Sequence, residues 1–410
     1  MIRGFSYDTI SGGFYSKDKL AGNGVGQISR NRVGTFTGNL TFPPLYTFIM
    51  DTSLFYSLLM MVLGMVLIYL AIKHKMEPTL LLPMGFGAIL ANIPGTMVIG
   101  ETGILTWLYE FGIERYEVFP LLLFIGIGAM IDFGPLLEKP WLIFVGAAGQ
   151  GGVFLTLIVA SLFFPLNDAA SIAIIGAADG PTAILVSERL HSTYMASILI
   201  AAYSYMALVP IIQPIVLKGV TTKKERRIKM TYTSRSISQS TKIIFPIAVT
   251  IISSLVAPDS ASLVGMLMFG NLLRECKVLD SLSSAAQNIL TPLISLLLGL
   301  SMAPLMRGEL IMRKETLMIM AFGLMAFVFG TVSGVVFIKI ANIFLPKDKK
   351  VNPLIGGAGL SAFPMSSRVV EKVGIESDKQ NHLLPFALGA NVAGQIGSVM
   401  AGGILLSLLK

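Results

Sequence analysis

The sequence predicts an all-α polytopic membrane protein with about 9–11 transmembrane or re-entrant helices. Of its 410 residues, 54% are hydrophobic and only 13% are charged, and the mean hydropathy is +0.75. Soluble domains carry about 25% charged residues. Apolar runs of membrane length recur from residue 53 to the C-terminus. Several runs are too short to cross a bilayer core about 30 Å thick, which indicates broken or re-entrant helices.

The hydrophobic pattern divides the chain into four parts. Residues 1–49 are glycine-rich and polar and lack the apolar core of a signal peptide. They are interpreted as a flexible N-terminal extension, with a start assigned upstream of Met50 as the alternative. Residues 50–216 are predicted as a first membrane half, residues 217–242 as a loop, and residues 243–410 as a second membrane half.

The formal net charge of +8 does not indicate binding to nucleic acid, because much of it lies in that loop. From Lys218 to Lys242 there are eight Lys and Arg residues against the single acid Glu225. By the positive-inside rule the loop is cytoplasmic, although such a patch also suits anionic lipid. The single cysteine, Cys276, and three scattered histidines exclude an internal disulfide and any zinc motif of closely spaced ligands.

Asp179 is the most informative residue. It lies in the apolar stretch 172–186, where an ionised carboxylate costs about 2.5–3.5 kcal/mol on insertion scales and therefore needs a compensating partner. Pro181 and the glycines beside it make a continuous helix unfavourable. Broken helices at membrane depth line cavities and bind ions. The sequence thus indicates an ion path, with simple capping of a half-helix by Asp179 as the alternative.

A faint internal repeat supports a transporter. Residues 174–181 align with residues 354–361 in the glycine-rich stretch 352–364, and an apolar span with uncharged polar groups follows each break. Paired interrupted segments in two halves are typical of a transporter's midplane binding site.

Several polar residues are candidate ligands, since hard cations such as sodium prefer oxygen. Asp179, Asn352, Ser361 and Asn391 provide such oxygens. For the two asparagines the alternative is that they only satisfy broken backbone. Tyr205 has packing as its alternative role. Arg368 either reaches the membrane interface or clamps an anionic group.

In order along the chain, several stretches resemble one family, the membrane-embedded beta subunit of the biotin-dependent, sodium-translocating decarboxylases. The resemblance covers roughly residues 53–410, and jointly the motifs are highly specific. The matching stretches are residues 77–87, 128–137, 176–184, 201–214, 269–275, 352–356, 361–365 and 391–394.

The resemblance implies a function. A carboxyltransferase subunit moves a carboxyl group from an acid or acyl-CoA to biotin on a carrier subunit. The beta subunit then decarboxylates the carboxybiotin with proton uptake and drives sodium outward. Family members are thought to have inverted repeats and to move in an elevator-like way. They lie in the cytoplasmic (inner) membrane of prokaryotes with a small gamma or delta subunit, and we expect a homo-oligomer within the complex.

The resemblance also implies residue roles. Asp179 matches the essential carboxylate and sodium ligand, with Asn352, Ser361 and Asn391 also near sodium. Tyr205 and Arg368 match catalytic positions, and Asn352, Gly356 and Arg368 match positions near the biotin group. No Met-Lys-Met biotinylation motif is present, so the biotin is expected on a partner.

Two departures bear on proton delivery and helix geometry: Phe386 and Ala390 replace a His and a Pro of family members. The alternative function is a stand-alone sodium/proton antiporter, for which one exchangeable carboxylate suffices. The sequence does not identify the acid or acyl-CoA that is decarboxylated.

Overall fold

The computed structural model describes residues 52–409, except residues 76, 231–235, 312 and 347–348. The predicted N-terminal extension, residues 1–49, lies outside the described residues. Over the described part the chain is helical and has no β-strand, which confirms the all-α prediction. Among the described residues, six helices are long and apolar enough to span a membrane. A bent pair, Met195–Met206 with Leu208–Val220, and three shorter apolar helices add to them, so the chain is polytopic as predicted.

The helices form two groups. Those of the peripheral group are long or apolar and expose large hydrophobic side chains, as expected of lipid-facing helices. Its main members are α2 (Thr52–His74), α3 (Pro78–Asn92), α5 (Val118–Met130), α13 (Gln239–Val256), α14 (Ala261–Glu275) and α16 (Thr291–Ser301). Short segments connect them: α4 (Ile104–Tyr109), η1 (Glu110–Glu114), η3 (Pro258–Ser260), α15 (Asp280–Ala285), η4 (Ala286–Leu290), η5 (Ala303–Leu305) and α17 (Gly308–Ile311).

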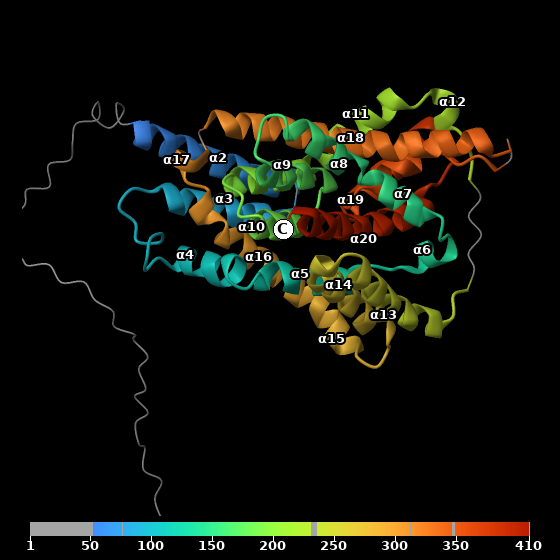
Figure 1. Cartoon of the computed structure of the whole chain (residues 1–410), viewed down its shortest axis with the longest axis horizontal. Coiled ribbons are helices and arrows are strands. Elements are labelled where there is room, and N and C mark those ends of the chain that lie inside the picture. Colours follow the sequence, from blue (N-terminus) through green and yellow to red (C-terminus); the bar gives the residue numbers. More distant parts are fainter. Residues whose placement is uncertain (1–51, 76, 231–235, 312, 347–348, 410) are drawn as a thin grey trace, which may run out of the picture. The chain divides into compact units, whose positions relative to one another are not determined.

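The central group contains both broken segments. Its members are α7 (Leu142–Gly149), α8 (Gly151–Ala160), α9 (Leu166–Ala173), η2 (Ile174–Ala177), α10 (Gly180–Arg189), α11 (Met195–Val220), α18 (Lys314–Phe344), η7 (Pro353–Gly359), α19 (Met365–Ser377) and α20 (Leu384–Leu409). The short α6 (Gly134–Glu138) precedes it, and α12 (Lys223–Arg226) follows α11. In Figure 1, α20 runs through the middle of the described part, with α18 and α11 on one side and α13 and α14 on the other.

The central group contains two similar units, and helices of each unit pack against helices of the other. Each unit has a 3-10 break, a short helix and a 26-residue helix: η2, α10 and α11 in the first, and η7, α19 and α20 in the second. α20 packs against α7 as α11 packs against α18, and α10 lies on α20 as α19 lies on α11. Such reciprocal packing of equivalent helices is typical of a two-fold internal repeat.

The two units run in opposite directions. The amide of Asn381, just before α20 begins, donates to the carbonyls of Arg226 and Ile228, just after α11 ends. The end of α11 and the start of α20 therefore share one face of the protein, which we call the basic-loop face. Equivalent helices that run in opposite directions constitute an inverted repeat, as the resemblance implied.

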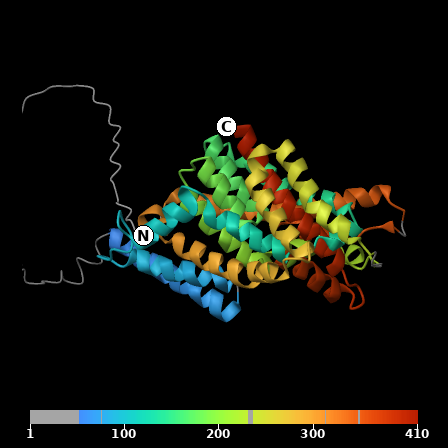
Figure 2. The ribbon, with the colours of Figure 1, turned by 90° about the horizontal axis from the view of Figure 1, so that it is seen from below.

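The helices of the peripheral group show the same reciprocal packing. α2 pairs with α3 and α13 pairs with α14, while α3 packs on α16 and α14 packs on α5. Figure 2 shows α2 and α3 beside α16, and α13 and α14 near α20. At the α5–α14 crossing, a Cβ added to Gly270 would lie 2.0 Å from the Ile125 carbonyl oxygen. The backbones approach so closely because small residues line the crossing.

The part of the loop that the structure describes begins with a capping box. Thr222 Oγ1 accepts a hydrogen bond from the Glu225 N–H, and Glu225 Oε2 accepts one from the Thr222 N–H at 2.6 Å. Lys339 Nζ on α18 lies 3.1 Å from Glu225 Oε1. Partial burial raises the pKa of Glu225, but the hydrogen bonds from Thr222 and Lys339 outweigh it and hold that pKa below its ordinary value.

A carboxylate whose pKa is lower in the folded than in the unfolded state stabilises the folded protein at pH values above the unfolded pKa. This stabilisation is lost as pH falls through the folded-state pKa. We expect Glu225→Gln to lower the melting temperature near about pH 7, with the difference from wild type shrinking as pH falls below about 4 and through the lowered folded-state pKa. The exposed pair of Glu309 and Arg307 supplies the control, Glu309→Gln, which should change little. A difference between Glu225→Gln and wild type that stayed constant from neutral to acid pH would contradict this account.

Candidate functional site

The two breaks lie against each other. η2 ends at Ala177, Ala178 takes a left-handed conformation with φ of 54°, and the extended Asp179 precedes α10. The second break, η7, is followed by the extended Leu360 and then Ser361. The Ser361 N–H donates to the Ala177 carbonyl at 3.2 Å. Segments about 180 residues apart in the sequence, which the repeat had paired, are thus joined by a backbone hydrogen bond.

Asp179 is buried at this junction and receives two hydroxyl groups. Its side chain is 4% exposed, and Oδ2 accepts from Thr182 Oγ1 at 2.7 Å and from Ser398 Oγ at 2.8 Å. It makes no side-chain capping hydrogen bond to α10. Residues of both units therefore hold the carboxylate.

The polar groups on α20 leave oxygen atoms available. Gln395 Nε2 donates to both the carbonyl and the hydroxyl of Ser361, and Asn391 Nδ2 donates to the Leu360 carbonyl. The other ends of these amides, Gln395 Oε1 and Asn391 Oδ1, are buried and have no hydrogen-bond partner within the described residues. Buried polar atoms normally have a partner, so these acceptors suit a bound cation.

The chemistry of the donor set fits a hard monovalent cation. One carboxylate, a hydroxyl group and amide and backbone carbonyl oxygens are the ligands that such ions take. Within the described residues no cluster of three or more His, Cys, Asp or Glu side chains could hold a metal ion, so the site differs from that of a transition metal.

A cavity of about 430 Å³ reaches Asp179 between the two helix groups. The central group contributes Asp179, Tyr203, Ser361 and Gln395, and the peripheral group contributes the start of α3, the end of α5 and the η4–α16 turn. The cavity is lined on one side by Met130, whose carbonyl accepts from Arg274 Nη1 at 2.8 Å. Arg274 lies beside Glu275, which pairs with Lys242 at the end of the basic loop, so the cavity lies toward the basic-loop face.

The structure brings Asp179 and Ser361 together at the cavity, holds Asn391 on the Leu360 carbonyl next to Ser361, and places Asn352 elsewhere. The Asn352 amide donates to the carbonyls of Arg226 and Ile228 at 2.9 Å each, and its Oδ1 accepts from the Leu354 N–H. These contacts fasten the loop to the start of η7. The predicted role of Asn352 near sodium stays a prediction.

Gly356, Tyr205 and Arg368 also lie outside the cavity lining. Gly356 packs on α18, where an added Cβ would lie 2.2 Å from the Gly334 carbonyl oxygen. The Tyr205 hydroxyl donates to the Met320 carbonyl at 2.6 Å, and Arg368 is exposed on α19. Their predicted roles in catalysis and biotin binding likewise stay predictions.

The sequence prediction missed Thr182, Ser398 and Gln395 as members of the site. Ser398 and Gln395 were visible as polar residues in the last apolar span, and Thr182 follows Asp179 by three residues. A hydroxyl three residues after an acid lies on the same helix face, which is the signal that could have found Thr182.

We expect Ser398→Ala to raise the sodium concentration for half-maximal activity about 10-fold, because a hydrogen bond to a charged group contributes about 1.5–3 kcal/mol. The maximal rate should be regained at high sodium. Ser407→Ala is the matched control on α20, because its exposed hydroxyl bonds Asp259 Oδ2 at 3.1 Å, away from the site. Equal sodium dependence in the two variants would show that Ser398 does not support the ion site.

Comparison with known proteins identifies the family. A model described as the Na+-transporting oxaloacetate decarboxylase beta subunit matches residues 56–409. The chain belongs to this family. Similar proteins include the methylmalonyl-CoA decarboxylase subunit beta of Propionigenium modestum, 44% identical over 86% of this chain and 94% of that protein. The glutaconyl-CoA decarboxylase subunit beta of Acidaminococcus fermentans is 44% identical over 85% of this chain and 92% of that protein. The oxaloacetate decarboxylase beta chain of Klebsiella pneumoniae is 40% identical over 85% and 94%.

Membership in the beta-subunit family confirms the resemblance stated from the sequence motifs. It covers nearly all the described residues and includes both breaks, and it favours the decarboxylase subunit over the stand-alone antiporter. The relatives carry the names of three different decarboxylases at similar identity, so similarity over this chain does not select a substrate.

Proposed function

We propose that this chain is the sodium-pumping beta subunit of a biotin-dependent decarboxylase complex. It decarboxylates carboxybiotin that a partner subunit delivers, and it couples this reaction to outward sodium transport. The observation that carries the proposal is a buried carboxylate at the junction of two broken helices, in a chain of this family. Sodium is the cargo, and the biotin group belongs to the partner.

Sodium binds at the junction in this proposal. The Asp179 carboxylate supplies the charge, and Ser361 and Asn391 supply neutral oxygens. Gln395 Oε1, buried and without a partner in the described part of the chain, is a further neutral ligand. Carbonyls freed at the two breaks complete the set.

The chemical step consumes one proton. The bond between the ring nitrogen of biotin and the carboxyl carbon breaks, carbon dioxide leaves, and the electron pair stays on the nitrogen, which takes up the proton. A carboxybiotin group that enters through the cavity lies beside Asp179. Tyr205 and Arg368 remain candidates for this step from the resemblance, in a conformation that brings them nearer.

An elevator-like motion of the central group against the peripheral group would carry the ion across. The interface between these two groups contains the cavity, on the side of the basic-loop face. At another point of this interface, Arg189 at the end of α10 donates two hydrogen bonds to Glu117, just before α5. Its Nε lies 2.6 Å from Glu117 Oε1 and its Nη2 lies 3.1 Å from Glu117 Oε2. This ion pair joins the two groups and would have to break during such a motion. With the basic loop on the cytoplasmic side of the inner membrane, the cavity faces the cytoplasm, from which sodium is taken.

The first test is to purify the tagged chain from its native cell in mild detergent and to probe it with labelled avidin. A stoichiometric biotinylated partner is expected, with a carboxyltransferase and a small membrane subunit. The complex is then assayed for sodium-stimulated decarboxylation of oxaloacetate, methylmalonyl-CoA, glutaconyl-CoA and malonate. A stable preparation without any biotin protein, combined with sodium/proton exchange by the chain alone, would overturn the proposal.

A further inference from the structure

Tyr203 is a buried phenol without a partner. Its side chain is 1% exposed, and within the described residues its hydroxyl makes no hydrogen bond. The same side chain lines the cavity that reaches Asp179. A buried hydroxyl without a partner costs about 1–3 kcal/mol, so the position implies a ligand that enters the cavity.

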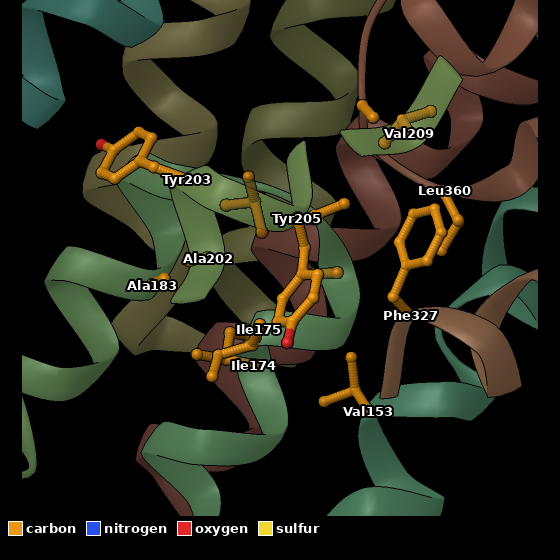
Figure 3. Packing of buried hydrophobic residues seen from close by; sticks show 14 of the residues in the cluster. Val153, Ile174, Ile175, Ala183, Ala202, Tyr203, Tyr205, Val209, Phe327 and Leu360 are labelled. Carbon is orange, nitrogen blue, oxygen red and sulfur yellow. The ribbon is translucent and has the colours of Figure 1, made fainter. Parts of the chain in front are cut away.

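Tyr205, the phenol implied by the resemblance, points to another side of α11. Two residues along a helix correspond to a rotation of about 200°, so neighbours at this spacing face away from each other. The Tyr205 hydroxyl bonds the Met320 carbonyl of α18 at 2.6 Å. Figure 3 shows the hydroxyl groups of Tyr203 and Tyr205 on different sides of the helix. Only Tyr203 of these two contributes to the cavity.

The ring of Tyr203 is held in place by the start of α10. A Cβ added to Gly180 would lie 2.1 Å from Tyr203 Cε1 and 2.8 Å from its hydroxyl oxygen. Gly180 follows Asp179 directly, so the glycine lets the phenol approach the break that carries the carboxylate. The hydroxyl is therefore positioned by packing rather than by a hydrogen bond.

The lining of the cavity combines acceptors with this donor. Asp179 and Gln395 Oε1 present oxygens that suit a cation. A phenol O–H suits an oxygen that is negative or becomes negative during a reaction. When the bond from the biotin nitrogen to the carboxyl carbon breaks, the electron pair left on nitrogen spreads to the ureido oxygen. A fixed donor at that oxygen stabilises the transition state.

We propose that Tyr203 is a further catalytic residue of this pump, whose hydroxyl donates to the ureido oxygen of the biotin group in the cavity beside Asp179. The inference rests on the proposed function and deepens it. It assigns the donor role to a residue other than the one implied by the resemblance. Carbon dioxide leaves, and the nitrogen takes the proton as described above, while Tyr203 keeps its own proton.

The test uses the complete complex, carrying carboxybiotin labelled with carbon-14 in the carboxyl group, and measures release of labelled carbon dioxide against sodium concentration. We expect Tyr203→Phe to slow release at saturating sodium about 100-fold, as loss of one such donor does. Half-saturation by sodium should change less than 2-fold, a readout that separates this role from ion binding. The melting temperature should not fall, because the hydroxyl has no partner within the described residues.

Tyr109→Phe is the matched control, because its hydroxyl lies 3.5 Å from the Met195 sulfur, outside the cavity lining. A wild-type rate for Tyr203→Phe, or a raised sodium requirement with the full rate regained at high sodium, would overturn the inference alone. A wild-type complex without biotin protein and without sodium-stimulated decarboxylation would overturn the proposed function as well. If Tyr203→Phe does not assemble, Tyr203→His, which keeps a ring donor, should exceed Tyr203→Met, and equal rates would contradict the inference.

Discussion

Asp179→Asn is expected to abolish sodium-stimulated decarboxylation, lowering the rate about 100-fold or more. An amide fills the same space and can still bond Thr182 and Ser398, but it removes the negative charge that compensates the cation. Loss of one partner from a buried charged pair costs about 2–5 kcal/mol, and each 1.4 kcal/mol is a factor of about ten. The measurement is the decarboxylation rate of the purified complex at increasing sodium.

The matched control is Asp280→Asn, which removes an exposed carboxylate at the start of α15. It should leave the sodium dependence unchanged. Sodium should raise the melting temperature of wild type and Asp280→Asn, but not that of Asp179→Asn, because a ligand stabilises only a state that binds it. Equal activity of the two variants would show that Asp179 is not the ion-binding carboxylate.

Gly270→Ala is expected to cause a large loss of stability, because it adds a methyl group at the close α5–α14 crossing. The new Cβ would lie 2.0 Å from the Ile125 carbonyl oxygen and 2.9 Å from the Ala129 nitrogen, and backbone atoms cannot rotate away. Separating the helices costs about 3 kcal/mol or more. We expect a melting temperature lower by about 5 °C or more, or failure to purify as a single species.

Gly265→Ala provides the control on the same helix. Its added Cβ would meet only Thr250 Cγ2, at 3.9 Å, which is ordinary contact. Alanine favours a helix over glycine by about 1 kcal/mol, so this variant should be at least as stable as wild type. If both alanine variants unfold at the same temperature, close backbone packing is not what stabilises the crossing.

The features that the sequence predicted depend on local physical chemistry. Low charge and repeated apolar runs are sufficient for an all-α membrane fold, because a backbone in lipid must satisfy its own hydrogen bonds. The break at Asp179 followed from Pro181 and the neighbouring glycines, and the structure shows η2 and η7 at the two positions that the repeat had aligned. The breaks and the internal repeat were therefore predictable from the residues, whereas the inverted orientation of the repeat was implied only by the family resemblance.

The composition of the site was only partly predictable, because it depends on which side chains meet after folding. Ser398 reaches Asp179 across 219 residues of sequence, and no spacing rule links them. The faces of α11 were also not predictable: Tyr203 and Tyr205 both lie in a stretch that is apolar all round, which gives no signal of which side faces the cavity. Asn352 resembled a ligand, yet its amide holds the loop.

The most direct test of the central claim is sodium flux in proteoliposomes that contain the purified complex. Radioactive sodium inside the vesicles is counted while the substrate is decarboxylated at the outer surface. Sodium should accumulate with wild type and with Asp280→Asn, and accumulation should cease with Asp179→Asn. Decarboxylation by the wild-type complex at full rate without sodium movement, in vesicles shown to be tight, would contradict the assignment of this chain as the pump.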